Sequence, residues 1–301
     1  MRTDACVNGA FLHVKDYMIY YDPTPGAIPH GHIIQTDTLP TVAKRLYKKW
    51  KATGEIDYLS DYAVVLIYQG QFEKARDIFI SIEKTHPGRY ATASNLGTVY
   101  ELLGDDTSAL KWIKRGIEIN PPSHDGTEWL HVNILKAKIN GGTYLCSDSL
   151  INANFGSEAM PKLNIPEFIY ALNGDIWYQV NERMTFIKGP DKIMALLFFD
   201  LGNSLFLIKY DNKYKKDIPL TEVLELYDLA KQYGCSGPLF DKRYKLVQDI
   251  ISGKFPRAGV PIVVPKTDYT LFYILGIGAS ILSIGLFFFF KRKKNKPDGH
   301  E

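Results

Sequence analysis

The chain has 301 residues, 46% of them apolar, so it can bury a sizeable core as one elongated domain or two smaller ones. Of its 36 basic and 33 acidic residues, five basic and two acidic lie in residues 291–301, which leaves 31 of each sign in residues 1–290. A body that is neutral overall argues against a concentrated basic face, and we therefore expect no nucleic-acid partner.

The N-terminal segment, residues 1–39, is predicted to be mostly irregular. Residues 11–21 could form a small hairpin, but Lys15-Asp16 is a poor turn pair. His30 and His32 offer two imidazoles without a third clustered ligand, so we expect no metal here.

A repeat of 34 residues follows, because residues 56–89 superpose on residues 90–123. The matched pairs are Gly70 and Gly104, Ala75 and Ala109, Phe79 and Ile113, and Pro87 and Pro121. The second unit reads Leu96-Gly97-x2-Tyr100, Ala109-x3-Ile113 and Pro121, which resembles the tetratricopeptide pattern except that Ala93 stands at its Trp position.

This resemblance implies an all-α fold, a tetratricopeptide-type solenoid of antiparallel helix pairs. Two units are too few for a stable stack, so flanking helices should add packing at residues 40–50 and 126–139. Together these elements predict a repeat core over residues 40–140. Gly70 and Gly104 are expected to end the first helix of each unit, as a left-handed cap favours glycine.

Residues 141–166 are rich in Gly, Asn, Ser and Pro and are predicted to be a connector. Residues 167–253 are expected to be helical, with a degenerate repeat in Phe198-x2-Leu201-Gly202-x2-Leu205 and Val223-x3-Tyr227. A polar insert separates these two helices, which a surface turn tolerates at modest entropic cost.

A Pro-rich stalk, a membrane span and a basic tail are predicted at residues 254–268, 269–290 and 291–301. Leu271 to Phe290 carries no charge over twenty residues, which is enough to cross a bilayer as one helix. Small residues spaced by four within the span could let two such helices associate weakly.

Topology follows from the basic run Lys291 to Lys294, because basic residues beside a span are retained in the cytoplasm. The repeat body would then lie outside, in the periplasm of a double-membrane bacterium. Residues 1–14 make a poor signal peptide, so either an upstream leader is missing or the protein is tail-anchored with its body in the cytoplasm.

The runs GTEWLHVNILKAK and YQVNERMTFIKGPDKIMALLFFDLGN resemble a group of bacterial membrane-anchored envelope proteins that carry tetratricopeptide repeats. The resemblance implies an envelope location. It also favours the missing leader, because members of that group commonly begin with a leader ending near an Ala-Cys pair such as Ala5-Cys6.

Motifs of enzyme chemistry are absent: the sequence has no HExxH, phosphate loop, Cys-x-x-Cys or G-x-S-x-G. We therefore expect no enzyme activity, no catalytic residue and no cofactor. His124 and His131 are interpreted as capping or packing residues. The spacing of Cys6, Cys146 and Cys235 leaves open whether two of them pair.

The function predicted instead is a membrane-anchored scaffold that binds a protein or peptide in a groove lined by the first helix of each repeat. The candidate groove residues are Asp57, Ser60, Val64, Ile67, Ser94, Asn95, Thr98 and Glu101. A clamp for a partner's terminal carboxylate is not expected, because Ser60 and Asp125 stand where basic residues would be needed. The alternatives are an envelope enzyme with a site in residues 1–39 and 141–190, or a purely structural envelope component.

Overall fold

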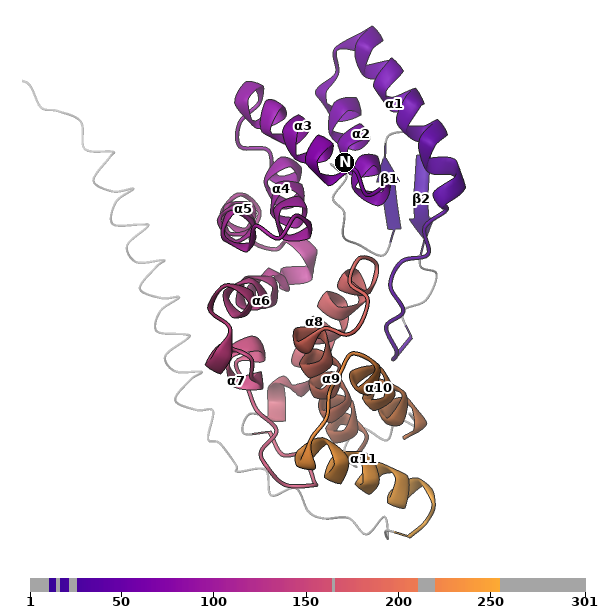
Figure 1. Ribbon diagram of the computed structural model, residues 1–301, viewed down its shortest axis with the longest axis vertical. Helices are drawn as coiled ribbons and strands as arrows, with labels where there is room; N and C mark the ends of the chain where they lie inside the picture. Colours follow the sequence, from indigo (N-terminus) through magenta and orange to yellow (C-terminus); the bar gives the residue numbers. More distant parts are fainter. Residues whose placement is uncertain (1–10, 15–16, 22–25, 164–165, 211–219, 255–301) are drawn as a thin grey trace, which may run out of the picture. The chain divides into compact units, whose positions relative to one another are not determined.

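The computed structural model describes residues 11–14, 17–21, 26–163, 166–210 and 220–254 (Figure 1). This part of the chain is mostly α-helical, as expected. Within it, no helix has the length and hydrophobicity that a membrane crossing requires. The span and tail predicted at residues 269–301, and the stalk beyond Lys254, lie outside the described residues.

Two strands precede the helices, within residues 11–21, where the sequence analysis considered a small hairpin but did not expect one. β1 (Phe11–Val14) pairs with β2 (Tyr17–Tyr21) in antiparallel register. Val14 and Ile19 are fully buried and join the core formed by α1 and α2. The turn sequence does not predict a hairpin. Burial of one face of the strands stabilises it instead, because β-propensity depends mainly on side-chain packing.

Five helices follow: α1 (Leu39–Thr53), α2 (Ile56–Tyr68), α3 (Phe72–Thr85), α4 (Tyr90–Leu102) and α5 (Asp106–Ile119). Each packs against the next in the chain. The bounds of α4 and α5 equal those of α2 and α3 displaced by 34 residues at both ends. The period in the sequence is therefore also the period of the helix pairs.

Glycine and proline end these helices as their backbone preferences require. Gly70 and Gly104 follow α2 and α4 with φ angles of 72° and 79°, in the left-handed region where only glycine is unstrained. Pro87 and Pro121 lie just beyond α3 and α5, because proline disfavours helical geometry in the residue before it.

Close helix crossings depend on two further glycines. A Cβ atom on Gly97 of α4 would lie 2.4 Å from Ile113 Cδ1 of α5. The same feature recurs between α9 (Lys192–Tyr210) and α10 (Thr221–Gln232), where a Cβ atom on Gly202 would lie 2.5 Å from Tyr227 Cε1. Both pairs of helices thus meet at a distance that excludes a larger side chain.

The segment predicted as a connector has structure of its own. After α6 (Glu128–Asn140) it forms a 3-10 turn at Gly142–Tyr144 and a short helix, α7 (Ser147–Ile151). Arg243 of α11 (Pro238–Ile251) fastens the next loop, because its Nη2 donates to the carbonyl oxygens of Phe155 and Gly156 at 2.7 and 2.6 Å. This segment is therefore part of the folded body, which the sequence prediction missed.

α8 (Ile169–Met184) links the two halves of the described chain. It packs against α6 on one side and α9 on the other, and α10 in turn packs against α9 and α11. Among the described residues, the buried apolar side chains form a large cluster over α6 to α11, a second from the hairpin to α4, and a small third one between α5 and α6. The site described below lies where α8 meets α4 and α6.

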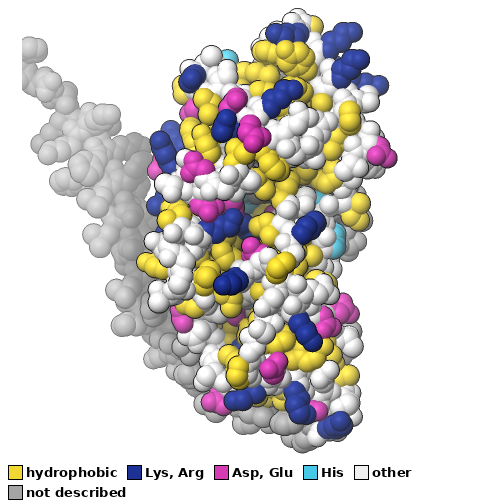
Figure 2. Space-filling model, in the orientation of Figure 1, with side chains coloured by type: hydrophobic (Ala, Val, Ile, Leu, Met, Phe, Trp, Pro, Cys, Tyr) yellow, Lys and Arg dark blue, Asp and Glu magenta, His cyan; other side chains and the backbone are white. Residues whose placement is uncertain are grey.

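Charge is unevenly distributed although the body is neutral overall. α1 carries Lys44, Arg45, Lys48, Lys49 and Lys51 but no acidic residue, and Lys and Arg side chains gather over it at the upper end of Figure 2. Elsewhere on the face in Figure 2, basic and acidic side chains are interspersed.

Candidate functional site

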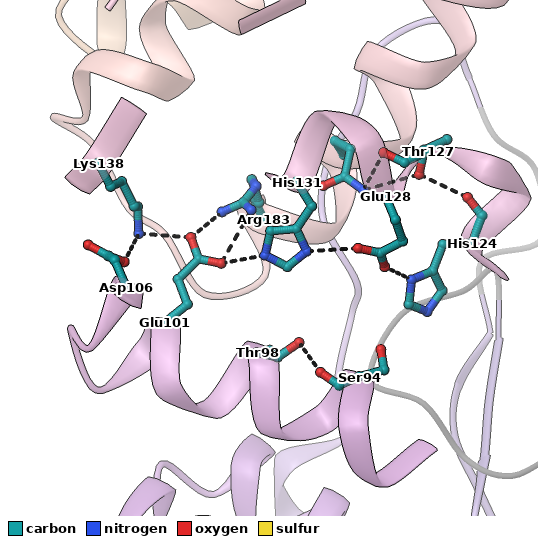
Figure 3. Close-up of polar contacts among 11 residues, drawn as sticks. Ser94, Thr98, Glu101, Asp106, His124, Thr127, Glu128, His131, Lys138 and Arg183 are labelled. Atoms are coloured by element: carbon teal, nitrogen blue, oxygen red, sulfur yellow. Dashed lines mark hydrogen bonds and ion pairs between the residues drawn. The ribbon is translucent and has the colours of Figure 1, made fainter. Parts of the chain in front are cut away.

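Ionisable side chains from α4, α8, α6 and the turn before α6 form a continuous, largely buried chain, drawn in Figure 3 and called here the polar network. Its members are His124, Glu128, His131, Glu101, Arg183 and Lys138. Buried charges are costly unless they are paired, so a cluster of this size requires mutually satisfied partners.

His131 stands at the centre of the polar network, between two carboxylates. Its Nδ1 lies 3.2 Å from Glu128 Oε2, and its Nε2 lies 2.7 Å from Glu101 Oε2. Burial and the nearby Arg183 lower the pKa of His131, but the contacts with Glu101 and Glu128 outweigh them and raise it above its usual value. Because each ring nitrogen faces a carboxylate, only the protonated ring can donate a hydrogen bond to both, and this pairing favours the imidazolium form.

Basic side chains from two other helices contact Glu101 of α4. Arg183 Nη1 of α8 and Lys138 Nζ of α6 approach its Oε1 at 2.6 and 2.8 Å. Burial raises the pKa of Glu101, but Arg183, His131 and Lys138 together hold it well below its usual value. Glu101 is therefore ionised, and it joins α4, α6 and α8 through charge-assisted contacts.

A strained turn leads into α6 at the other end of the polar network. His124 and Asp125 have φ angles of 49° and 53°, although neither is glycine, and Gly126 follows at 77°. Left-handed residues of this kind cost on the order of 1–3 kcal/mol each and persist only where their surroundings hold them.

Contacts of His124 supply that constraint. Its Nδ1 is hydrogen-bonded to the Glu128 carboxylate, its Nε2 lies 3.3 Å from the Tyr90 hydroxyl, and its ring stacks on Tyr178. Burial raises the pKa of Glu128, but the hydrogen bonds to His124 and His131 lower it far below its usual value. The strained turn is thus held by an ionised carboxylate at its base.

The segment that contains His30 and His32 wraps around the C-terminal end of α8. The backbone N–H groups of His30 and Gly31 both donate to Asn181 Oδ1 at 3.0 Å, and His32 Nε2 lies 2.9 Å from Glu182 Oε2. The His32 side chain is therefore paired with Glu182 inside the fold. Among the described residues, no group of three or more His, Cys, Asp or Glu could hold a metal ion.

A pocket of about 260 Å³ opens beside the polar network. Its walls come from α4, α6 and α8 with the residues after it: Thr98, Glu101, Leu102, His131, Lys138, Gln179, Glu182, Arg183, Phe186 and Ile187. The charged side chains of the polar network form its polar end, and Leu102, Phe186 and Ile187 supply apolar surface.

Of the eight predicted groove residues, two line this pocket, namely Thr98 and Glu101. Five others are buried within the chain's own packing: Ser60, Val64, Ile67, Ser94 and Asn95. The remaining one, Asp57, forms an ion pair with Arg89 Nη2 at 2.6 Å. The expectation of an open groove at all eight positions is therefore corrected.

The predicted groove residues are buried because other segments of the chain cover α2 and α4. β1 packs against α2, and Phe186, just beyond α8, stacks on Tyr68 with ring centroids 5.5 Å apart. Further along α8, Gln179 Nε2 donates to Thr127 Oγ1 at 3.1 Å. Segments distant in sequence thus occupy the surface that the repeat pattern alone would leave open.

The sequence interpretation of His124 and His131 is that they are capping or packing residues, and the structure buries both side chains. It missed Glu128, although Glu128 and His131 are three positions apart on α6 and so share one side of that helix. It also missed Arg183, which had no sequence signal because it lies 82 residues from Glu101.

Chemically, most polar atoms of the polar network are paired with one another, although Arg183 Nε is buried without a hydrogen-bond partner among the described residues. Both nitrogens of His131 face carboxylates, and the Glu101 carboxylate faces His131, Arg183 and Lys138. These groups are suited to joining helices rather than to accepting a substrate proton.

No protein-family model and no curated protein matches this sequence.

Proposed function

We propose that this chain is a membrane-anchored tetratricopeptide-type repeat protein that binds another protein or a peptide. The proposal rests on the sequence repeat of the helix pairs. The residue bounds of α4 and α5 equal those of α2 and α3 plus 34. Stacked helix pairs of this period bury a shared core and expose an extended surface, a design suited to binding polypeptide.

The surface proposed for the partner is the pocket beside the polar network. Thr98 and Glu101 are first-helix positions of the second repeat, and both line it. At about 260 Å³ the pocket is smaller than the roughly 300–1,000 Å³ typical of small-molecule sites. It therefore suits one anchoring side chain of a partner whose other contacts spread over the rim.

Anchoring belongs to the same proposal and is supported by the uncharged stretch Leu271 to Phe290 with the basic run after it. The basic tail would stay in the cytoplasm and the helical body would lie outside. A reporter enzyme fused after Glu301 and active only in the cytoplasm should then be active, and loss of its activity would reverse the topology.

Site-specific photocrosslinking in the cells that produce the protein tests the binding surface. A photoreactive amino acid replaces Thr98 in the pocket or, as the control, Lys114 on the exposed side of α5. We expect a discrete protein adduct from position 98 that is absent from position 114. Equal adducts at both positions, or none at position 98, would remove the pocket as a partner site.

The structural alternative is also favoured by one observation. Five of the eight groove positions are buried by the chain itself, which leaves little of the repeat surface for a ligand. A chain that shows no position-specific adduct, and whose removal alters only the mechanical or osmotic resistance of the cell, would fit this alternative better.

A further inference from the structure

A second pocket, of about 390 Å³, lies away from the polar network. It is bounded by α6, α7, the loop after α7 and the first half of α8. Its polar and aromatic lining comprises Trp129, Asp148, Asn152, Asn154, Phe168 and Asp175, and the rest is aliphatic. Its volume falls within the range of roughly 300–1,000 Å³ that is typical of small-ligand sites.

The two carboxyl groups of this pocket, Asp148 and Asp175, form no ion pair with any residue that the structure describes. Asp175 Oδ2 accepts a hydrogen bond from Trp129 Nε1 at 3.0 Å, and Asp148 Oδ1 accepts one from Asn154 Nδ2 at 2.8 Å. Among the described residues, no Lys, Arg or His lines the pocket. Burial raises the pKa of Asp175, and only the bond from Trp129 opposes it. Among the described lining residues, none supplies a positive charge that would compensate these two carboxyl groups.

Aromatic rings complete the lining. Phe168 is 61% exposed, which is unusual for a large apolar side chain, and Trp129 presents a second ring while its indole N–H is used by Asp175. Aromatic faces attract cations, and two carboxylates nearby add to that attraction. A Ca²⁺ ion needs six to eight oxygen ligands and cannot use the rings, so the lining suits an organic cation better.

We propose that this pocket binds a primary ammonium group carried on a short alkyl stem, with the ammonium between Asp148 and Asp175 and the stem against Trp129 and Phe168. A free alkylamine and the lysine side chain of a peptide share this chemistry. The proposal does not depend on the partner site beside Thr98, because none of its residues lines that pocket.

Fluorine NMR of the full chain with 5-fluorotryptophan tests the proposal. The chain is held in an uncharged polyoxyethylene detergent, which presents neither an amine nor a sugar. The protein has four tryptophans, and Trp129→Phe identifies the signal of residue 129. We expect n-butylammonium to shift this signal saturably while the signals of the other three stay in place.

Matched variants separate charge from shape. Asp175→Asn keeps an acceptor for the indole N–H but removes the charge, and we expect it to weaken n-butylammonium binding at least tenfold. Asp148→Asn should also weaken binding. Asp37→Asn, at an exposed site far along the chain, should leave the affinity unchanged. Unshifted signals of the other tryptophans show in each variant that the fold is intact.

Further ligands show whether the bound ammonium group belongs to a peptide or to a free amine, and which results would contradict the proposal. Binding of a lysine peptide, but not of the same peptide with an acetylated side chain, would assign the pocket to a polypeptide partner; binding of n-butylammonium alone would assign it to a free amine. An equal shift with n-butanol, an unchanged affinity in Asp175→Asn, or a saturable shift with methyl glucoside and none with n-butylammonium would overturn the proposal.

Discussion

Arg183 Nη1 lies 2.6 Å from Glu101 Oε1 and so joins α8 to α4 across 82 residues of chain. Both side chains are more than nine-tenths buried. An ion pair at this depth is held by its partners, because either charge alone would be left without water. The pair therefore fixes where α8 lies on the repeat helices, and with it the shape of the pocket beside Thr98.

Glu101→Gln should lower the free energy of unfolding by about 3–5 kcal/mol, because it removes one partner from a buried charged set. The exposed pair of Arg115 with Glu118 provides the control, and Glu118→Gln should cost less than about 1 kcal/mol. Urea denaturation of the detergent-solubilised chain, followed by tryptophan fluorescence, measures both. Equal effects of the two substitutions would show that the polar network contributes no more than a surface pair.

The polar network should make stability depend on pH in two directions. The folded pKa of His131 is raised above 6.5, so its contribution is complete below pH 6.5 and is lost as the pH rises through the folded value. The folded pKa values of Glu101 and Glu128 are lowered below 4.5, so their contribution is complete above pH 4.5 and is lost in acid.

The contribution of the network should therefore be largest between about pH 4.5 and 6.5, the usual pKa values of Glu and His. His131→Gln should flatten the alkaline side of the stability profile and leave a dependence in acid. Unfolding free energies measured from pH 4 to 9 give both profiles. An alkaline slope that survives in His131→Gln would assign it to another group.

Asp200 of α9 should also make stability depend on pH. Burial raises its pKa to about 7, although hydrogen bonds from Ser147 and Asn203 lower it. A carboxyl with a raised folded pKa destabilises the folded state as the pH rises from its unfolded value towards 7. Asp200→Asn should therefore stabilise the chain at pH 8, at about 1.4 kcal/mol for each unit of pKa shift that it removes. The gain should be less than half as large at pH 5, because only the interval between the unfolded pKa of about 3.9 and pH 5 then contributes. A gain of the same size at both pH values would show that the charge is not its cause.

Gly97→Ala tests the close crossing of α4 and α5. The added Cβ atom would lie 2.4 Å from Ile113 Cδ1, and we expect a loss of about 1–3 kcal/mol from overpacking. Gly174→Ala on α8 is the matched control, because nothing lies within 4 Å of its added Cβ atom. That substitution should stabilise the helix by up to about 1 kcal/mol.

The Ile113→Val change should recover part of the loss in Gly97→Ala, since it removes the nearest clashing methyl group. Thermal melting of the three variants ranks them. A neutral Gly97→Ala variant would show that the helices do not approach as closely as the structure places them.

Cys235 should react slowly with alkylating reagents in the folded chain. Burial and the charges of Asp200 and Asp241 raise the pKa of Cys235 to about 11, so little thiolate is present at pH 8. In a chain with Cys6→Ser and Cys146→Ser, iodoacetamide should label Cys235 at least tenfold more slowly in the folded state than in urea. Mass spectrometry follows the label. Similar rates in both states would contradict the burial of this thiol, and would also make it usable as a topology probe.

Much of the secondary structure could be predicted from the sequence. The period of 34 residues, the glycines at the ends of α2 and α4 and the prolines after α3 and α5 are local signals, and the helices begin and end in accordance with them. The flanking helices α1 and α6 were also predicted, from the spacing of their apolar residues.

The hairpin β1–β2 and the short helix α7 were not predicted, because neither has a strong local signal. Val14 and Ile19 form strands since one face of the hairpin is buried against α1 and α2. The loop after α7 is fixed by Arg243, whose contacts with Phe155 and Gly156 cross 88 and 87 residues. Pairings at such separations leave no period in the sequence.

The sequence by itself determined the helix pairs, their caps and the residues that face the inside of each pair, because those depend on neighbours three and four positions apart. Only the tertiary structure decided what becomes of the repeat surface. It brings α8 and Phe186 over α2 and α4, buries Asn95, pairs Glu101 with Arg183 and leaves Thr98 beside a pocket. The physical reason is that burial and charge pairing act through space, and a repeat pattern records the shape of each unit but not which distant segment will cover it.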